Sequence, residues 1–111
     1  MAKLYQIKFS EPSEKLEGAQ QTVREGEIIL LENLFRFAGA NLKDVVKINE
    51  CLDVVVQLQN MADDQDHINL TKSDLESLKL GISTSAGKRP PIWMDLVALW
   101  KQFEKPEEVV A

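Results

Sequence analysis

The sequence predicts a mainly helical fold, in which about four helices pack as a small bundle beside an N-terminal β-strand or hairpin. Four segments carry apolar residues at the three- and four-residue spacing typical of helices that cover one another. One segment at the start of the chain alternates instead, as strands do. The 111 residues are 44% hydrophobic and 28% charged, which suits one globular domain. Within a single domain over 1–111, we expect a strand and flexible loop over 1–21, a helical core over 22–104 and a tail over 105–111.

The N-terminal element is predicted from alternation. Residues 3–9 place apolar and polar side chains in turn, which indicates a half-buried strand. Residues 10–21 are charged and contain proline and glycine, so a mobile loop or wide turn is expected. Because a lone strand is marginally stable, its edge should pair with residues 20–23 or with another subunit.

The first helix is predicted over about residues 23–38. Thr22 begins a T-x-x-E pattern typical of an N-terminal capping box, and Gly39 is placed to stop the helix in the left-handed conformation. Gly26 weakens the first turn, so a start at Glu27 is the alternative. The expected core stripe is Ile28, Leu31, Leu34, Phe35 and Ala38.

The second helix is predicted from an Asn41 cap to about Ala62. Its valines also suit a strand, but the apolar pattern continues for longer than a typical strand. Apolar residues cover more than one stripe, so we expect this to be the central helix, contacted on two sides. One line comprises Val45, Ile48, Leu52, Val55, Gln59 and Ala62, and it is flanked by Val46, Val56 and Leu58.

In the rest of the chain, capping residues and prolines indicate where the elements begin and end. Residues 63–69 form a polar break, after which Thr71 with Asp74 should cap a shorter helix that reaches about residue 82. Residues 83–89 are expected to form a loop. Prolines at 90 and 91 suit the first turn of a last helix that ends near residue 103, before the tail.

Composition excludes several kinds of partner. The formal net charge is −5, and no basic stripe is present to neutralise phosphates, so direct nucleic-acid binding is not expected. The longest apolar run is Ile28–Leu31, so no membrane span is expected. The N-terminus lacks the apolar core of a signal peptide, and Cys51 has no second cysteine to bond with. A cytoplasmic location is therefore expected, or the virion if the protein is phage-encoded.

Three apparent motifs do not satisfy the chemistry that they suggest. Gly81 and Gly87 enclose five residues rather than the four of a phosphate-binding loop, and Arg89 occupies the position of the magnesium-binding hydroxyl. The acidic segment after Asp64 lacks the sixth-position glycine and twelfth-position glutamate of a calcium loop. His67 is the single histidine and has no ligand cluster around it in the sequence. We expect no catalytic residue, metal or cofactor, although the many acidic residues leave a carboxylate pair open.

The apolar stripe Trp93, Trp100 and Phe103 has two interpretations. Stripes at helical spacing usually face the core. Tryptophan is also enriched at binding hot spots, and more apolar residues lie here than one stripe needs. If this region is an interface, its partner-binding residues are Lys88, Arg89, Trp93, Met94, Trp100, Val109 and Val110.

The layout resembles that of small accessory proteins encoded by tailed bacteriophages and prophages. The stretch "INLTKSDLESLKLGI" contains their recurrent L-T-x-x-D-x-x-x-L-K pattern, and "RPPIWMDLVALWKQF" provides a final proline-led helix. The resemblance covers residues 26–103, whereas the loop over 10–21 and the two tryptophans depart from it. It implies a head or tail morphogenesis protein that works through protein contacts, and it transfers no catalytic residue.

The sequence therefore predicts a non-enzymatic interaction or assembly protein that binds a protein partner or a further copy of itself. The alternative is a small acidic inhibitor or regulator that masks a host protein. An enzyme is the third hypothesis, because it needs a carboxylate pair or a meeting of Cys51 with His67.

Overall fold

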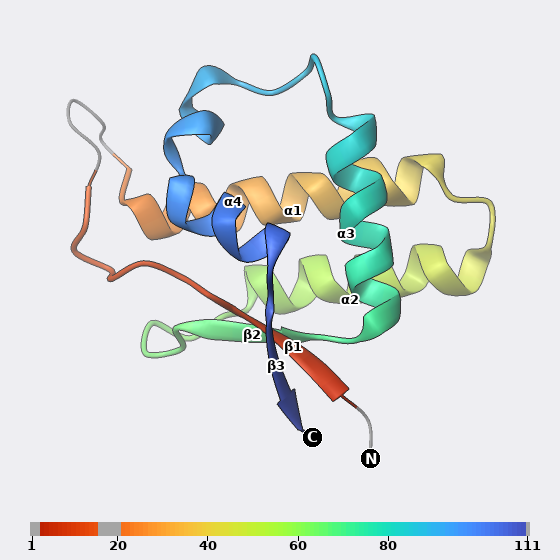
Figure 1. Cartoon of the computed structure of the whole chain (residues 1–111), viewed down its shortest axis with the longest axis horizontal. Coiled ribbons are helices and arrows are strands. Elements are labelled where there is room, and N and C mark those ends of the chain that lie inside the picture. The colour runs from red at the N-terminus through yellow and green to blue at the C-terminus, as the bar shows by residue number, and fades with distance from the viewer. Residues whose placement is uncertain (1–2, 16–20, 111) are drawn as a thin grey trace.

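Figure 1 shows the computed structural model, which describes residues 3–15 and 21–110. Helices dominate these residues and a small antiparallel sheet accompanies them, so the mainly helical class with a minor β part is confirmed. The helices do not form a side-by-side bundle. Helices α1 (Val23–Asn41) and α2 (Val45–Gln59) lie antiparallel, and α3 (Lys72–Thr84) crosses both of them.

The sheet joins segments that are far apart in the sequence. Strand β1 (Lys3–Lys8) lies between β2 (His67–Leu70) and β3 (Glu107–Val110), and both pairings are antiparallel. Ile7 is opposite Ile68 in β2, and Leu4 is opposite Val109 in β3. The two partner strands therefore come from the segments predicted to be a polar break and a tail.

The expected pairing of residues 3–9 with residues 20–23 is wrong. Thr22 instead forms an isolated bridge with Lys15, and Gln20 lies in 16–20, outside the described residues. Alternation identified β1 as half-buried, but it did not show which of the later segments could reach it. The choice of partner depended on where α2 returns the chain before β2 and on where α4 (Val97–Glu104) returns it before β3.

The central helix is α1 rather than α2. It packs against α2 on one side and against α3 on the other, and its residues Leu30, Leu31, Leu34 and Phe35 have no exposed side-chain surface. The core continues through one apolar face of α2. That face consists of Cys51, Val54, Val55 and Leu58.

Thr22 and Thr71 cap α1 and α3 as predicted, but the reciprocal half of the capping box, from the second side chain, is formed at α3 and not at α1. The Thr22 hydroxyl accepts from the Glu25 amide, and Thr71 and Asp74 form a complete capping box at α3. Gly26 lies inside α1, so the alternative start at Glu27 is wrong.

The boundary between α1 and α2 differs from its prediction. Helix α1 continues through Gly39 to Asn41, whose side-chain amide donates to the Phe37 carbonyl. Asp44 caps α2 instead, because its carboxylate accepts from the Val46 amide. Cap-forming side chains occur at both 41 and 44, and local sequence does not distinguish between them.

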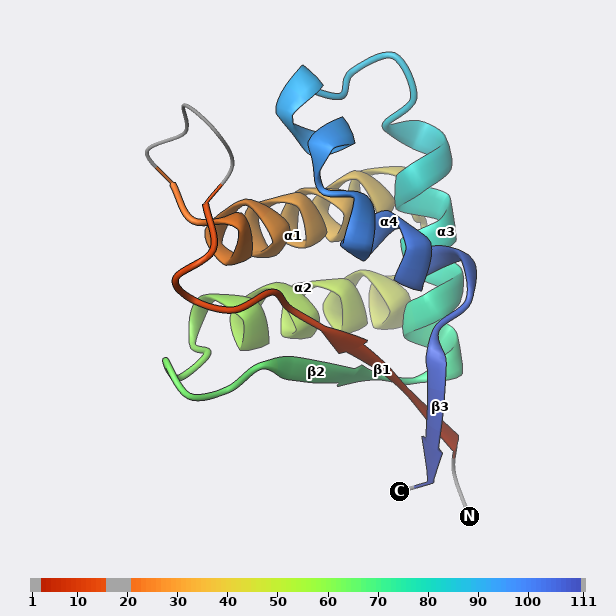
Figure 2. The same ribbon diagram turned by 60° about the vertical axis from the view of Figure 1, so that its left-hand side comes forward.

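The predicted last helix is divided in two. A 3₁₀ helix, η1 (Pro91–Asp95), is separated from α4 (Val97–Glu104) by Leu96, whose ψ of 56° is not helical. Leu96 is nevertheless buried in the core. The change in chain direction between η1 and α4 therefore places this side chain inside the molecule. Helix α4 then lies against β1 (Figure 2), and β3 follows directly.

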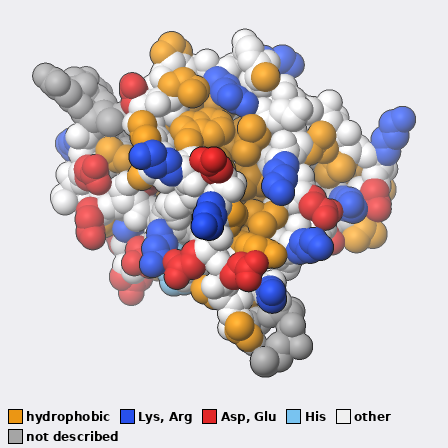
Figure 3. All heavy atoms as spheres, viewed as in Figure 1, with side chains coloured by type: hydrophobic (Ala, Val, Ile, Leu, Met, Phe, Trp, Pro, Cys, Tyr) orange, Lys and Arg blue, Asp and Glu red, His pale blue; other side chains and the backbone are white. Residues whose placement is uncertain are grey.

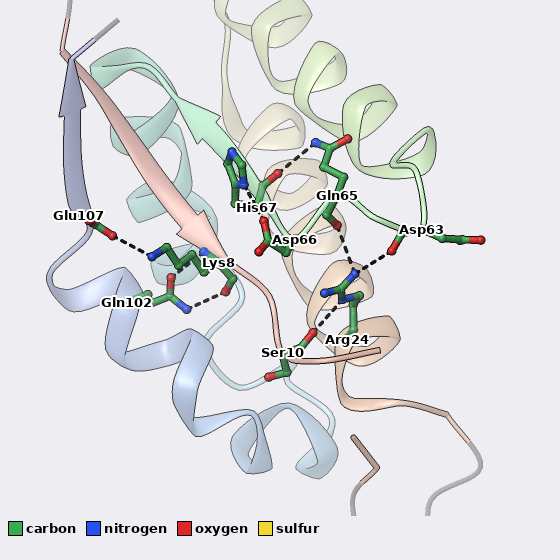
Figure 4. Close-up of polar contacts among 9 residues, drawn as sticks. All are labelled: Lys8, Ser10, Arg24, Asp63, Gln65, Asp66, His67, Gln102 and Glu107. Atoms are coloured by element: carbon green, nitrogen blue, oxygen red, sulfur yellow. Dashed lines mark hydrogen bonds and ion pairs between the residues drawn. The ribbon is translucent and has the colours of Figure 1, made fainter. Parts of the chain in front are cut away.

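Two polar contacts hold the sheet against the helices (Figure 4). The Gln102 side-chain amide donates to the Lys8 carbonyl and accepts from the Lys8 amide, both at 2.7 Å. This extends the hydrogen bonding of β1 past the end of its pairing with β3. The Arg24 guanidinium donates to the carbonyls of Ser10, Asp63 and Gln65, so it joins the segment after β1 to the segment before β2.

Candidate interaction surfaces

The tryptophans of the C-terminal region point inward rather than outward. Trp93 is 6% exposed, and Trp100 is partly buried. The Trp100 indole donates to the Trp93 carbonyl at 2.7 Å and meets the buried Phe103 ring edge-on at 5.3 Å. This geometry agrees with core packing of the stripe, and Trp93 in particular has little exposed surface for a partner to contact.

The basic loop residues differ in their availability. The Arg89 guanidinium lies over the Trp100 ring at 4.9 Å, and it also donates to the Ser85 hydroxyl and the Ile82 carbonyl. These contacts hold the loop after α3 against α4. Lys88 is exposed, and its amino group lies 5.9 Å from the centre of the Phe37 ring. Lys88 is therefore the freer of the two cations.

Some of the expected C-terminal surface remains accessible. Met94 is 54% exposed, and Ile92 and Val97 beside it in the chain are also exposed. Val109 is partly buried in β3 and Val110 is exposed at its end. Figure 3 shows hydrophobic side chains gathered near the middle of one face, with Lys and Arg side chains around them.

A second apolar surface lies on α2, where the sequence predicted contact on both sides. Val45 is 67% exposed, and Leu52 and Val56 are each 51% exposed. Ile48 is partly exposed between them. We call these four residues, Val45, Ile48, Leu52 and Val56, the α2 stripe. Helical periodicity signalled this surface as an excess of apolar residues, but it did not show which stripe the core would leave uncovered.

The acidic residues of α2 lie away from the α2 stripe. Glu50 and Asp53 line a shallow pocket together with Thr71 and Asp74, on the side of α2 that faces α3. The Ser73 hydroxyl donates to the Glu50 carboxylate at 2.7 Å. Among the exposed side chains beside the α2 stripe, Asn49, Gln59 and Asn60 are uncharged. Asp53 is charged, and it lies about 100° from Leu52 around the helix axis. The four residues of the α2 stripe thus carry no charge themselves, and the nearest exposed carboxylate on the helix is at the edge of the stripe.

The residues considered for nucleophilic or metal chemistry are not gathered into a site. Cys51 is buried, and burial raises the pKa of its thiol while the Ser77 side chain acts in the opposite direction. His67 is near the surface, where its Nδ1 lies 2.8 Å from the Asp66 carboxylate. Within residues 3–15 and 21–110, no group of three or more His, Cys, Asp or Glu side chains is arranged to hold a metal ion.

One buried carboxylate was missed by the sequence interpretation. Glu27 is 1% exposed, and its two oxygens accept from the Ser10 amide at 2.7 Å and from the Ser10 hydroxyl at 3.0 Å. Burial raises its pKa above the ordinary value of 4.5, and the Ser10 hydrogen bonds oppose that rise. Glu27 holds the chain after β1 against α1, so its contacts are structural.

Comparison with protein-family models, with curated proteins and with solved structures found no match. The resemblance to phage accessory proteins therefore depends on the sequence patterns alone. Among the described residues, no helix has the length and apolar character needed to cross a membrane.

Proposed function

We propose that the protein is a non-enzymatic interaction or assembly protein that binds a protein partner through the α2 stripe. The observation that carries this proposal is the exposure of Val45, Leu52 and Val56 on one helix. Contiguous apolar surface on a small domain commonly marks an interaction site.

The energetics favour covering this surface. Full burial of a valine or leucine side chain contributes about 1.5–3 kcal/mol relative to exposure. Because these side chains are about half exposed, burial of each one by a partner would contribute on the order of 1 kcal/mol to the free energy of binding. The sum is modest against the cost of association, so it supports reversible binding rather than a permanent complex.

The C-terminal region offers a smaller, separate surface. Ile92, Met94 and Val97 are exposed there, and the cation of Lys88 is available to steer an acidic group. Trp93 and Arg89 are engaged within the fold, so in this proposal they support that surface instead of touching the partner. The phage-like sequence patterns make head or tail assembly the setting to test first.

Site-specific photo-crosslinking in the producing cell tests the proposal. A photoreactive amino acid at position 52 should give light-dependent adducts with protein, because the side chain there would contact the partner. The matched control is position 76, where Glu76 is exposed on α3 and outside the α2 stripe. Adducts of similar yield at both positions, or none at position 52, would contradict the proposal.

The identity of the crosslinked protein distinguishes between the three forms of the proposal. Crosslinks to a virion structural protein support morphogenesis, whereas crosslinks to a cellular enzyme or regulator support the masking hypothesis. Crosslinks to a second copy of the chain support self-assembly.

A further inference from the structure

We propose that the α2 stripe pairs with the α2 stripe of a second copy of this chain, with the two helices antiparallel about a two-fold axis at Leu52. This inference rests on the proposed function, because it names the partner of that same surface. It is argued from the spacing, the charge and the extent of the stripe.

The residues of this surface are spaced symmetrically along α2 about Leu52. Ile48 and Val56 lie four residues to either side, and Val45 and Gln59 lie seven residues to either side. An antiparallel two-fold pair places residue 52 against residue 52, residue 48 against residue 56, and residue 45 against residue 59. Each apolar side chain within one turn of the centre therefore meets an apolar side chain, and the outer positions pair Val45 with the neutral Gln59.

The charge distribution also favours a second copy. Each copy carries a formal net charge of −5, so repulsion between two copies is small where the facing side chains are uncharged. The α2 stripe carries no charge, and the exposed Asp53 beside it lies about 100° from Leu52 around the helix axis, on the side of Glu50. A partner of different charge would be better recognised by a complementary charged rim, and the acidic Glu50 and Asp53 instead face the α3 side.

The extent of the stripe sets the strength of the pair. Helix α2 has 15 residues and is therefore about 22 Å long. A helix pair of this length buries on the order of 400 Å² per copy, about half of what a standard stable interface buries. We therefore expect a weak, reversible dimer, with a dissociation constant between about 10 µM and about 1 mM.

Sedimentation equilibrium of the purified full chain, up to about 1 mM, tests the dimer. The wild-type chain should shift reversibly from monomer to dimer. Leu52→Asp, which places two carboxylates at the axis, should raise the dissociation constant more than about tenfold. Val56→Asp should act in the same direction, and it keeps the test valid if the first variant fails to fold.

Val46→Asp is the matched control. Val46 is 65% exposed on the same helix, but it points about 100° away from Val45 around the helix axis. Dimerisation should survive this substitution within about twofold. Circular dichroism of every variant checks that α2 remains folded.

Cysteine crosslinking tests the two-fold geometry in a Cys51→Ala background. Leu52→Cys should form a disulfide dimer on its own. Val45→Cys should crosslink only when it is mixed with Gln59→Cys, whereas a parallel pair would let Val45→Cys crosslink with itself.

A wild-type chain that remains monomeric at every concentration, or equal loss of the dimer in Leu52→Asp and Val46→Asp, would overturn the inference. Monomeric behaviour together with photo-crosslinks from position 52 to another protein would leave the proposed function standing. Failure of this inference is therefore distinguishable from failure of that function.

Discussion

At the residue scale, Gly26 in α1 and Gly81 in α3 serve different purposes. A Cβ added to Gly81 would lie 2.0 Å from the Leu34 carbonyl oxygen, which belongs to the backbone of the crossing helix. A Cβ added to Gly26 would meet only the Leu96 methyl groups, at an ordinary 3.6 Å. Gly81 therefore permits the close crossing of α3 over α1, whereas Gly26 is not required by packing.

This contrast predicts opposite effects of the same substitution. Gly81→Ala should destabilise the protein by about 3 kcal/mol or more, because the backbone of α1 must move to admit the methyl group. Gly26→Ala should stabilise it by about 0.5–1 kcal/mol through helix propensity. Urea unfolding of both variants measures the two changes in free energy, and equal effects would contradict this account of Gly81.

At the element scale, β1 depends on hydrogen bonds from α4 as well as from its neighbouring strands. The pairing of β1 with β3 ends at Gln6, and the Gln102 side chain then forms hydrogen bonds with both the amide and the carbonyl of Lys8. The Lys8 side chain also lies 3.5 Å from the Glu107 carboxylate, but both partners are exposed, and such surface pairs contribute little. The Gln102 amide is thus the principal tie between α4 and the far end of β1.

Gln102→Ala should cost about 1–2 kcal/mol, because it removes two hydrogen bonds from the backbone of β1. Hydrogen exchange localises the effect, since the Lys8 amide should lose protection. Lys101→Ala is the control on the same helix, where the side chain is exposed, and it should change stability by less than about 0.5 kcal/mol. Unchanged protection of the Lys8 amide in the Gln102 variant would refute the proposed tie.

At the scale of the whole molecule, carboxylates that are fully or partly buried couple stability to pH. Burial raises the pKa values of Glu27, Glu32 and Asp74 in the folded chain. A carboxyl whose folded pKa is raised contributes stability below its unfolded pKa, and that contribution is lost as pH rises through the folded pKa. Excess negative charge acts in the same direction, because deprotonation increases repulsion within a chain that is already acidic.

The wild-type free energy of unfolding should therefore decrease as pH rises above the ordinary glutamate pKa of 4.5 and through the raised pKa of Glu27. Glu27→Gln removes that titration, so its stability relative to wild type should increase over the same range. Denaturant unfolding at several pH values measures this difference. A Glu27→Gln curve that runs parallel to the wild-type curve would contradict the assignment.

Local chemistry along the sequence determined most of the helical elements. Thr22 and Thr71 begin their helices as their side chains predict, because a cap satisfies backbone groups a few residues away. Helical periodicity also placed Leu31, Leu34, Phe35 and Ala38 in the core, where they are buried. These features depend on residues that are close in sequence, so they could be predicted without knowledge of the tertiary structure.

The tertiary structure decided which segments meet and which surfaces stay open. Residues 67–70 and 107–110 became strands only because β1 lies between them, and short segments rich in polar or acidic residues carry little strand signal of their own. Trp93 was buried and Leu52 was exposed by the way the helices cross, although both lie in apolar helical patterns. Periodicity shows that a side chain favours burial, but the finite contact area between packed helices determines which apolar stripe is covered.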